Sequence, residues 1–239
     1  MLKINSVYHR LVRRALLKGL AAWAVALVLP ARAFAFWLKN FPVRTVEKHD
    51  WRFDPQSGKV VSENRAPETY QLVVDGLVES PVRLSHQELK QLPQEKQVSD
   101  FHCVEGWSVA DLAWEGFRFV ELAKLVKPKP EAAWVVFHSL GQTRFAAGGL
   151  KHYLEAFPLA ELLDPKRRIL LAMKLDGKPL DFSHGSPLRL LAPLDLAYKS
   201  IKYVTRAEFT DKAQAGWWTR ANPIYPITAR APQERLRRK

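Results

Sequence analysis

Apolar and polar residues alternate in short segments along most of the chain, and proline or glycine separates these segments. The sixteen prolines are spread over 239 residues and make long helices unfavourable. Tyr70–Val74 is a strand-like apolar run that ends at an Asp-Gly turn. Phe119–Val126 has helical apolar spacing and ends before Pro128, which predicts a helix. Four further segments are predicted strands: Ala132–Phe137, Ile169–Leu175, Leu188–Ala192 and Ser200–Phe209.

Shorter helical signals lie between these strands. Ser85 and Glu88 form a capping box that predicts a helix ending before Pro93, and Leu159–Leu163 suits one helical turn. Phe36–Pro67 is rich in aromatic residues without a clear period, which predicts an irregular segment wrapped around the domain. Because strands outnumber helices and both are short, we predict an α+β fold of mixed β-sheets with short helices.

The first 35 residues have the composition of an export signal. They contain six Lys or Arg residues and no acid, and Arg13-Arg14 begins a twin-arginine pattern. The apolar run that follows, residues 20–29, is shorter than the roughly 20 residues needed to span a bilayer. Ala33-Phe34-Ala35 resembles a cleavage site. We therefore expect a twin-arginine signal peptide at 1–35 and a periplasmic protein; an uncleaved amphipathic anchor is the alternative.

Most of the positive charge lies at the two ends of the chain. The formal net charge of +13 includes +6 from residues 1–35 and +4 from 230–239, which leaves +3 for 36–229. A nucleic-acid partner would require a clustered basic surface, so none is predicted. We expect 36–229 to form one domain. The basic tail, 230–239, is expected to stay solvated or to touch acidic lipid or a partner.

Cys103 is the only cysteine in the chain. It cannot form an internal disulfide, which leaves three roles open: an inert core residue, a nucleophile, or a soft metal ligand. As a nucleophile it would need His138 or His184 as a base, and the sequence shows no obvious third residue to orient either one.

Other polar residues occur where a plain core would not need them. His138 follows a predicted buried strand, and His184 lies in a loop rich in glycine and proline. Arg189 is flanked by leucines, so its buried guanidinium needs an anion, either a protein carboxylate or a phosphate. Strand alternation would place Ser200 and Lys202 on one face as a second phosphate contact; a half-exposed edge strand is the alternative.

The order of these motifs resembles the sulfite-oxidase superfamily of molybdopterin enzymes, and most closely its periplasmic protein-methionine-sulfoxide reductase branch. The resemblance runs from about Tyr70 to Trp218. The motifs that carry it are Cys103-Val104-Glu105-Gly106-Trp107-Ser108, Trp114-Glu115-Gly116, Gly185-Ser186-Pro187-Leu188-Arg189 and Tyr198-Lys199-Ser200-Ile201-Lys202.

The resemblance implies one molybdenum and one molybdopterin per chain. It implies that Cys103 is the metal ligand and the catalytic residue. Contacts to the pterin and its phosphate are implied for His138, His184, Arg189, Ser200, Ile201 and Lys202. His138 and His184 differ from the Thr or Ser and the Asn expected at those positions. A looser correspondence suggests a further pterin contact near His49–Phe53.

The resemblance also implies an oxygen-atom-transfer oxidoreductase. Val104-Glu105-Gly106-Trp107 stands where eukaryotic sulfite oxidases have Gly-Asn-Arg-Arg, so we favour reduction of an S-oxide or N-oxide. Sulfite-type oxidation and a non-catalytic binding module of the same fold are alternatives. The expected partners are a small or protein-bound oxide substrate and a haem-containing membrane electron donor. No C-terminal dimerisation domain is expected, and the catalytic subunit is expected to be monomeric.

Overall fold

The computed structural model describes residues 45–236. The predicted signal segment and residues 237–239 of the basic tail lie outside this range. Within 45–236, no helix is long and apolar enough to cross a membrane.

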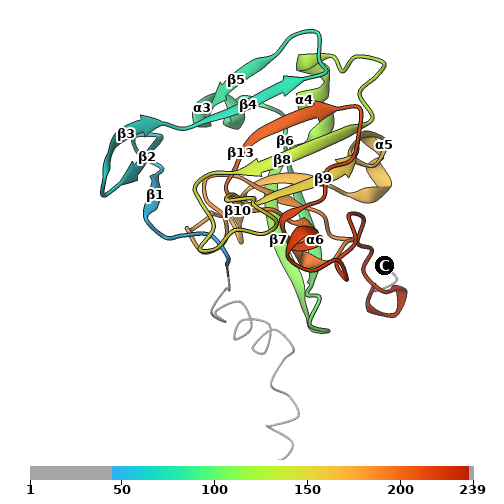
Figure 1. Ribbon diagram of the computed structural model, residues 1–239. Coiled ribbons are helices and arrows are strands. Elements are labelled where there is room, and N and C mark those ends of the chain that lie inside the picture. The colour runs from blue at the N-terminus through green and yellow to red at the C-terminus, as the bar shows by residue number, and fades with distance from the viewer. Residues whose placement is uncertain (1–44, 237–239) are drawn as a thin grey trace, which may run out of the picture. The chain divides into compact units, whose positions relative to one another are not determined.

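Three β-sheets form the framework of the described residues (Figure 1). A small antiparallel sheet contains β1 (Trp51–Asp54), β2 (Lys59–Ser62) and β3 (Arg65–Thr69). A second sheet has the order β11-β10-β7-β6, with β12 also paired to β10. Its strands are β6 (Gln94–His102), β7 (Ser108–Arg118), β10 (Leu170–Leu175), β11 (Lys178–Pro179) and β12 (Arg189–Leu191).

The third sheet has the order β5-β4-β13-β8-β9. Its strands are β4 (Gln71–Gly76), β5 (Val82–Ser85), β8 (Trp134–Ser139), β9 (Leu154–Pro158) and β13 (Val204–Thr210). Only β4 and β13 pair in parallel, so the sheet is mixed, as the sequence predicts. The α-helices are short: α3 (His86–Gln91), α4 (Phe119–Val126), α5 (Leu159–Leu163) and α6 (Trp217–Ala221). The 3-10 turns are η1 (Pro165–Arg167), η2 (Ala197–Lys199) and η3 (Gln233–Arg235).

One apolar core joins the two larger sheets. Phe119, at the start of α4, packs on Phe137 of β8 and Phe209 of β13, with both ring centroids 5.8 Å away. Leu171 and Leu190, from the other large sheet, are fully buried in the same core. Burial of such side chains is worth roughly 1.5–3 kcal/mol each, so this core fixes β12 relative to the third sheet.

Several predicted elements are confirmed. The helix at Phe119–Val126, the helical turn at Leu159–Leu163 and the capping box at Ser85 all form as predicted. The predicted α+β fold class is also confirmed, because the third sheet is mixed, the other two are antiparallel and the helices are short.

Two local predictions are wrong. The segment predicted to be irregular contains β1, β2 and β3 between Trp51 and Thr69. The strand predicted to begin at Ser200 begins at Val204, because Ala197–Lys199 is a 3-10 turn and Tyr203 has a left-handed φ of 56°. Strand alternation therefore does not govern the side chains of residues 200–203.

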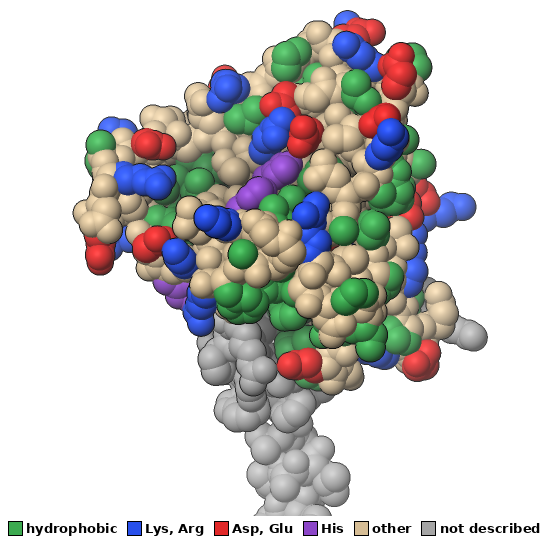
Figure 2. All heavy atoms as spheres, in the orientation of Figure 1, with side chains coloured by type: hydrophobic (Ala, Val, Ile, Leu, Met, Phe, Trp, Pro, Cys, Tyr) green, Lys and Arg blue, Asp and Glu red, His purple; other side chains and the backbone are tan. Residues whose placement is uncertain are grey.

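The basic tail is also not simply solvated. Arg230 forms ion pairs with Glu161 and Asp195, and Arg235 hydrogen-bonds the loop that follows β6. Acidic and basic side chains are interspersed over the face seen in Figure 2, in keeping with the small charge of residues 36–229.

Candidate functional site

Cys103 lies at the start of the hairpin loop between β6 and β7. Its N–H donates to the Trp107 carbonyl at 2.9 Å, and the Gly106 N–H donates to the Cys103 carbonyl at 3.2 Å. Gly106 has a φ of +94°, which a side chain would disfavour. The β6–β7 register shifts between Ser99 and Phe101, and such a bulge redirects the side chains that follow it.

The Cys103 side chain is half-buried. Burial raises the pKa of its thiol, the Glu105 carboxylate adds to this rise, and Arg235 opposes it. Metal binding to this thiol would have to displace a firmly held proton, as thiolate ligation always requires.

Arg189 of β12 is 3% exposed, as its leucine neighbours predict. It donates to two backbone carbonyls, those of His184 at 3.0 Å and Ser200 at 3.1 Å. Its guanidinium lies over the rings of Phe101 (5.3 Å) and Trp114 (5.1 Å). Phe101 is two residues before Cys103, so the two parts of the predicted site meet at this ring.

Within residues 45–236 no carboxylate forms an ion pair with Arg189, although the charge of the buried Glu47 partly offsets the lowering of its pKa by burial. Its Nε atom is buried without a hydrogen-bond partner, and burial lowers its pKa to about 10. The alternative of a protein carboxylate, left open by the sequence, is therefore met by no direct contact in this range, and Glu47 acts on the guanidinium without pairing with it. A buried guanidinium with a free donor fits an anionic ligand.

Lys202 is a second cation that has a buried donor without a hydrogen-bond partner. Its Nζ atom is buried without a hydrogen-bond partner, and burial together with the charge of Arg189 lowers its pKa to about 8. Gly185 holds the two side chains close: a Cβ atom there would lie 3.0 Å from the Lys202 Cβ and 3.2 Å from the Arg189 Cβ. The unpaired donors on these two side chains fit a phosphate group.

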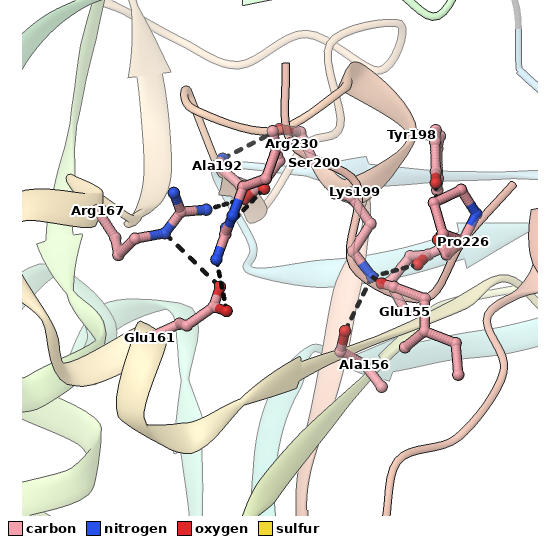
Figure 3. A network of polar contacts seen from close by, with 12 residues as sticks. Glu155, Ala156, Glu161, Arg167, Ala192, Tyr198, Lys199, Ser200, Pro226 and Arg230 are labelled. Carbon is pink, nitrogen blue, oxygen red and sulfur yellow. Dashed lines mark hydrogen bonds and ion pairs between the residues drawn. The ribbon is translucent and has the colours of Figure 1, made fainter. Parts of the chain in front are cut away.

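The segment 199–201 is anchored from both sides. The Ser200 hydroxyl accepts the Ala192 N–H at 3.0 Å, and the Ile201 carbonyl accepts the Leu190 N–H at 2.9 Å. Lys199 donates to the Glu155 carboxylate at 2.7 Å and to two carbonyls, as Figure 3 shows in part. Ser200 and Ile201 are therefore fixed next to Arg189, although they do not lie in a strand.

The two histidines occupy different places. The His184 ring contacts Asp181 at 2.8 Å, and its carbonyl accepts Arg189, so it borders the cation pair. The His138 ring contacts His152 at 3.1 Å and Glu208 at 3.2 Å, and no contact joins it to Arg189 or Lys202 within the described range. The structure thus groups His184, Arg189, Ser200, Ile201 and Lys202, with Cys103 two residues after the Phe101 ring that Arg189 covers, and it does not join His138 to them.

Other residues near the site could not be identified from the sequence alone. Ser139, next to His138, has a buried hydroxyl without a partner, and a hydroxyl is what the resemblance leads one to expect near this point. Trp51 packs edge-on against Phe182 and Tyr203, which precede His184 and follow Lys202 respectively. The loose correspondence at His49–Phe53 was the only sequence signal for this contact.

Comparisons with known proteins identify the family and the fold. The model of the family described as oxidoreductase molybdopterin binding domain matches residues 58–218. Among solved structures, the sulfane dehydrogenase SoxCD from Paracoccus pantotrophus is similar, with a TM-score of 0.52 and 22% identity over 72% of this chain. The match covers 46% of that chain, and at this identity it shows a shared fold. The predicted molybdopterin-binding fold and the molybdenum–molybdopterin cofactor are confirmed.

Proposed function

This chain belongs to the oxidoreductase molybdopterin-binding domain family, and we propose that it reduces an S-oxide or N-oxide substrate by two-electron oxygen-atom transfer in the periplasm. When bound, the cofactor supplies a redox centre that exchanges an oxygen atom with the substrate. The reaction consumes two electrons and two protons and releases the reduced substrate and water.

Different residues of the site would hold the metal and the phosphate of the cofactor. Cys103 is the only thiol that the chain can offer to the metal. Arg189 and Lys202 hold the phosphate through the donors that lack protein partners. The Ser200 and His184 carbonyls keep the guanidinium in place, so the clamp is organised by the protein itself.

The exposed side chains of the cysteine loop, residues 103–107, support the proposal that the substrate is neutral. Val104 and Trp107 are 41% and 48% exposed, and the Trp107 ring donates to the Glu105 carboxylate at 3.2 Å. Arg235, the cation at this loop, directs its donors to carbonyls and a hydroxyl of the loop. An apolar surface beside an acid suits a neutral sulfoxide better than sulfite, which the acid would repel.

The location and the electron donor are part of the proposal. The twin-arginine pattern at Arg13-Arg14 supports export of the folded, cofactor-loaded protein. A haem-bearing membrane protein would then supply the two electrons, and the catalytic subunit would be monomeric.

Two measurements on purified mature protein test the function. Metal analysis should find molybdenum near one per chain, and its absence from correctly matured protein would contradict the proposal. A dye-linked assay should show reduction of sulfoxides or N-oxides. Sulfite oxidation without oxide reduction would favour the oxidase alternative, and a loaded protein without any turnover would favour the binding module.

A further inference from the structure

The C-terminal segment runs along the edge of the cysteine site. The Leu196 N–H donates to the Ala229 carbonyl at 2.8 Å, and the Ala231 N–H donates to the Leu194 carbonyl at 3.0 Å. Leu196 also forms a parallel bridge with His102, the residue before Cys103. The end of β6, the 194–196 segment and the 229–231 segment therefore lie side by side.

Ion pairs fix the start of this C-terminal segment. Arg230 binds Asp195 at 2.9 Å and Glu161 at 2.5 Å, and Arg167 binds Asp195 at 2.6 Å (Figure 3 shows the two arginines with Glu161). Because Asp195 is buried, losing an arginine would leave a buried carboxylate short of a partner, which costs more than breaking an exposed pair.

Arg235 then reaches the loop itself. Its guanidinium donates to the Cys103 carbonyl at 2.8 Å, to the Trp107 carbonyl, and to the Ser108 hydroxyl at 3.1 Å. These acceptors lie at both ends of the loop, so one planar side chain closes it. Apart from the Arg235 contacts, backbone hydrogen bonds join Cys103 with Trp107 and with Gly106 inside the loop.

We infer that Arg235 is a positioning residue of the site, which fixes the backbone of Cys103 and so the direction in which its sulfur meets the metal. The inference rests on the proposed role of Cys103. A metal ligand must be held close to its productive geometry by neighbours that are themselves fixed. A short, half-exposed hairpin loop does not provide this alone, since such loops open locally at small free-energy cost. The clamp from the C-terminal segment supplies the missing support.

Hydrogen exchange on the cofactor-loaded full chain tests the clamp without using activity. In Arg235→Ala, amides of residues 101–109 should exchange about tenfold faster or more, because the variant loses charge-assisted hydrogen bonds to this loop. Amides of β10 should exchange as in the wild type. Arg235→Lys should recover part of the protection, because an ammonium keeps the charge but lacks the planar fork. Glu234→Ala is the matched control in the same 3-10 turn and should leave the loop unchanged.

A spectroscopic measurement then distinguishes a role in positioning the Cys103 sulfur from a general contribution to the stability of the fold. The molybdenum-edge absorption spectrum of Arg235→Ala should show an altered thiolate-sulfur shell with molybdenum content retained, and kcat should fall more than KM changes. Unchanged exchange over residues 101–109, or an equal rise over β10, would overturn the inference. If the protein fails to reduce any oxide but the exchange result holds, the clamp stands and only the proposed reaction fails.

Discussion

Arg189 and Lys202 pack against the same glycine, and within residues 45–236 neither forms an ion pair with a carboxylate, although the charge of Glu47 acts on both. Bringing two like charges this close is costly without a counter-ion, and each charge has a donor with no partner. We therefore propose that the pair binds the cofactor phosphate, which would supply the acceptors that both side chains lack.

Removing Arg189 should release the cofactor. Arg189→Ala deletes the charge-assisted hydrogen bonds to the phosphate, each worth about 1.5–3 kcal/mol, so cofactor affinity should fall roughly tenfold to hundredfold. Molybdenum content per chain after purification measures this loss. Arg206→Ala, which removes a partly exposed arginine paired with Asp75, is the control and should keep its molybdenum.

Gly185 should tolerate no side chain. Its φ of +101° disfavours any L residue, and a Cβ atom would approach the side chains of Lys202 and Arg189. Gly185→Ala should cost about 1–3 kcal/mol and lower molybdenum content. Gly58→Ala shares the positive φ but meets nothing within 4 Å, so it should lose some stability and no molybdenum. Equal molybdenum loss in both variants would show that the contact has no role.

The folding stability of the cofactor-free chain should depend on the titration of Lys202 at alkaline pH. Its folded pKa of about 8 lies below the ordinary 10.5, so between these values the unfolded chain binds more protons than the folded chain. Stability from this group therefore rises with pH across that window, by at most about 3 kcal/mol. Lys202→Met should be the more stable protein at pH 7, and its advantage should shrink toward pH 10.5. Denaturant melts at several pH values measure the difference; a constant advantage would show that Lys202 does not titrate in the window.

The buried Lys199–Glu155 pair should support the segment that holds Arg189. Lys199→Met leaves a buried carboxylate without its partner and should cost about 3–5 kcal/mol. The double variant with Glu155→Gln should recover part of this loss, since the buried charge is then gone. Lys124→Met breaks an exposed pair with Glu121 and should cost less than about 1 kcal/mol. Chemical denaturation of the three variants checks the order.

Sequence patterns identified the parts of the fold that local signals encode. The helix at Phe119–Val126 has helical periodicity and forms where predicted, and the apolar run at Ala132–Phe137 forms a strand that lies two residues further on, at Trp134–Ser139. β6 could not be predicted, because Gln94–His102 is mostly polar and becomes a strand by pairing with β7. The register of Ser200 was mistaken because a 3-10 turn and the left-handed Tyr203 break the strand there.

The site was partly predictable for similar reasons. The leucines beside Arg189 predict its burial. The order of the motifs predicts that Cys103 and Lys202 belong to the site. The position of His138 could not be predicted, because neighbouring strand residues face opposite sides and a shift of one residue exchanges them. Arg235 was missed because a basic C-terminal run has the composition of a solvated tail, and only tertiary contacts distinguish it.

Molybdenum-edge X-ray absorption of loaded wild type and Cys103→Ser tests the central claim most directly. The serine hydroxyl cannot replace a soft thiolate, whereas Arg189 and Lys202 would still hold the phosphate. The variant should therefore be folded, keep most of its molybdenum, show one sulfur ligand fewer than the wild type, and lose nearly all turnover. An unchanged sulfur count with wild-type turnover would contradict the assignment of Cys103 as the metal ligand.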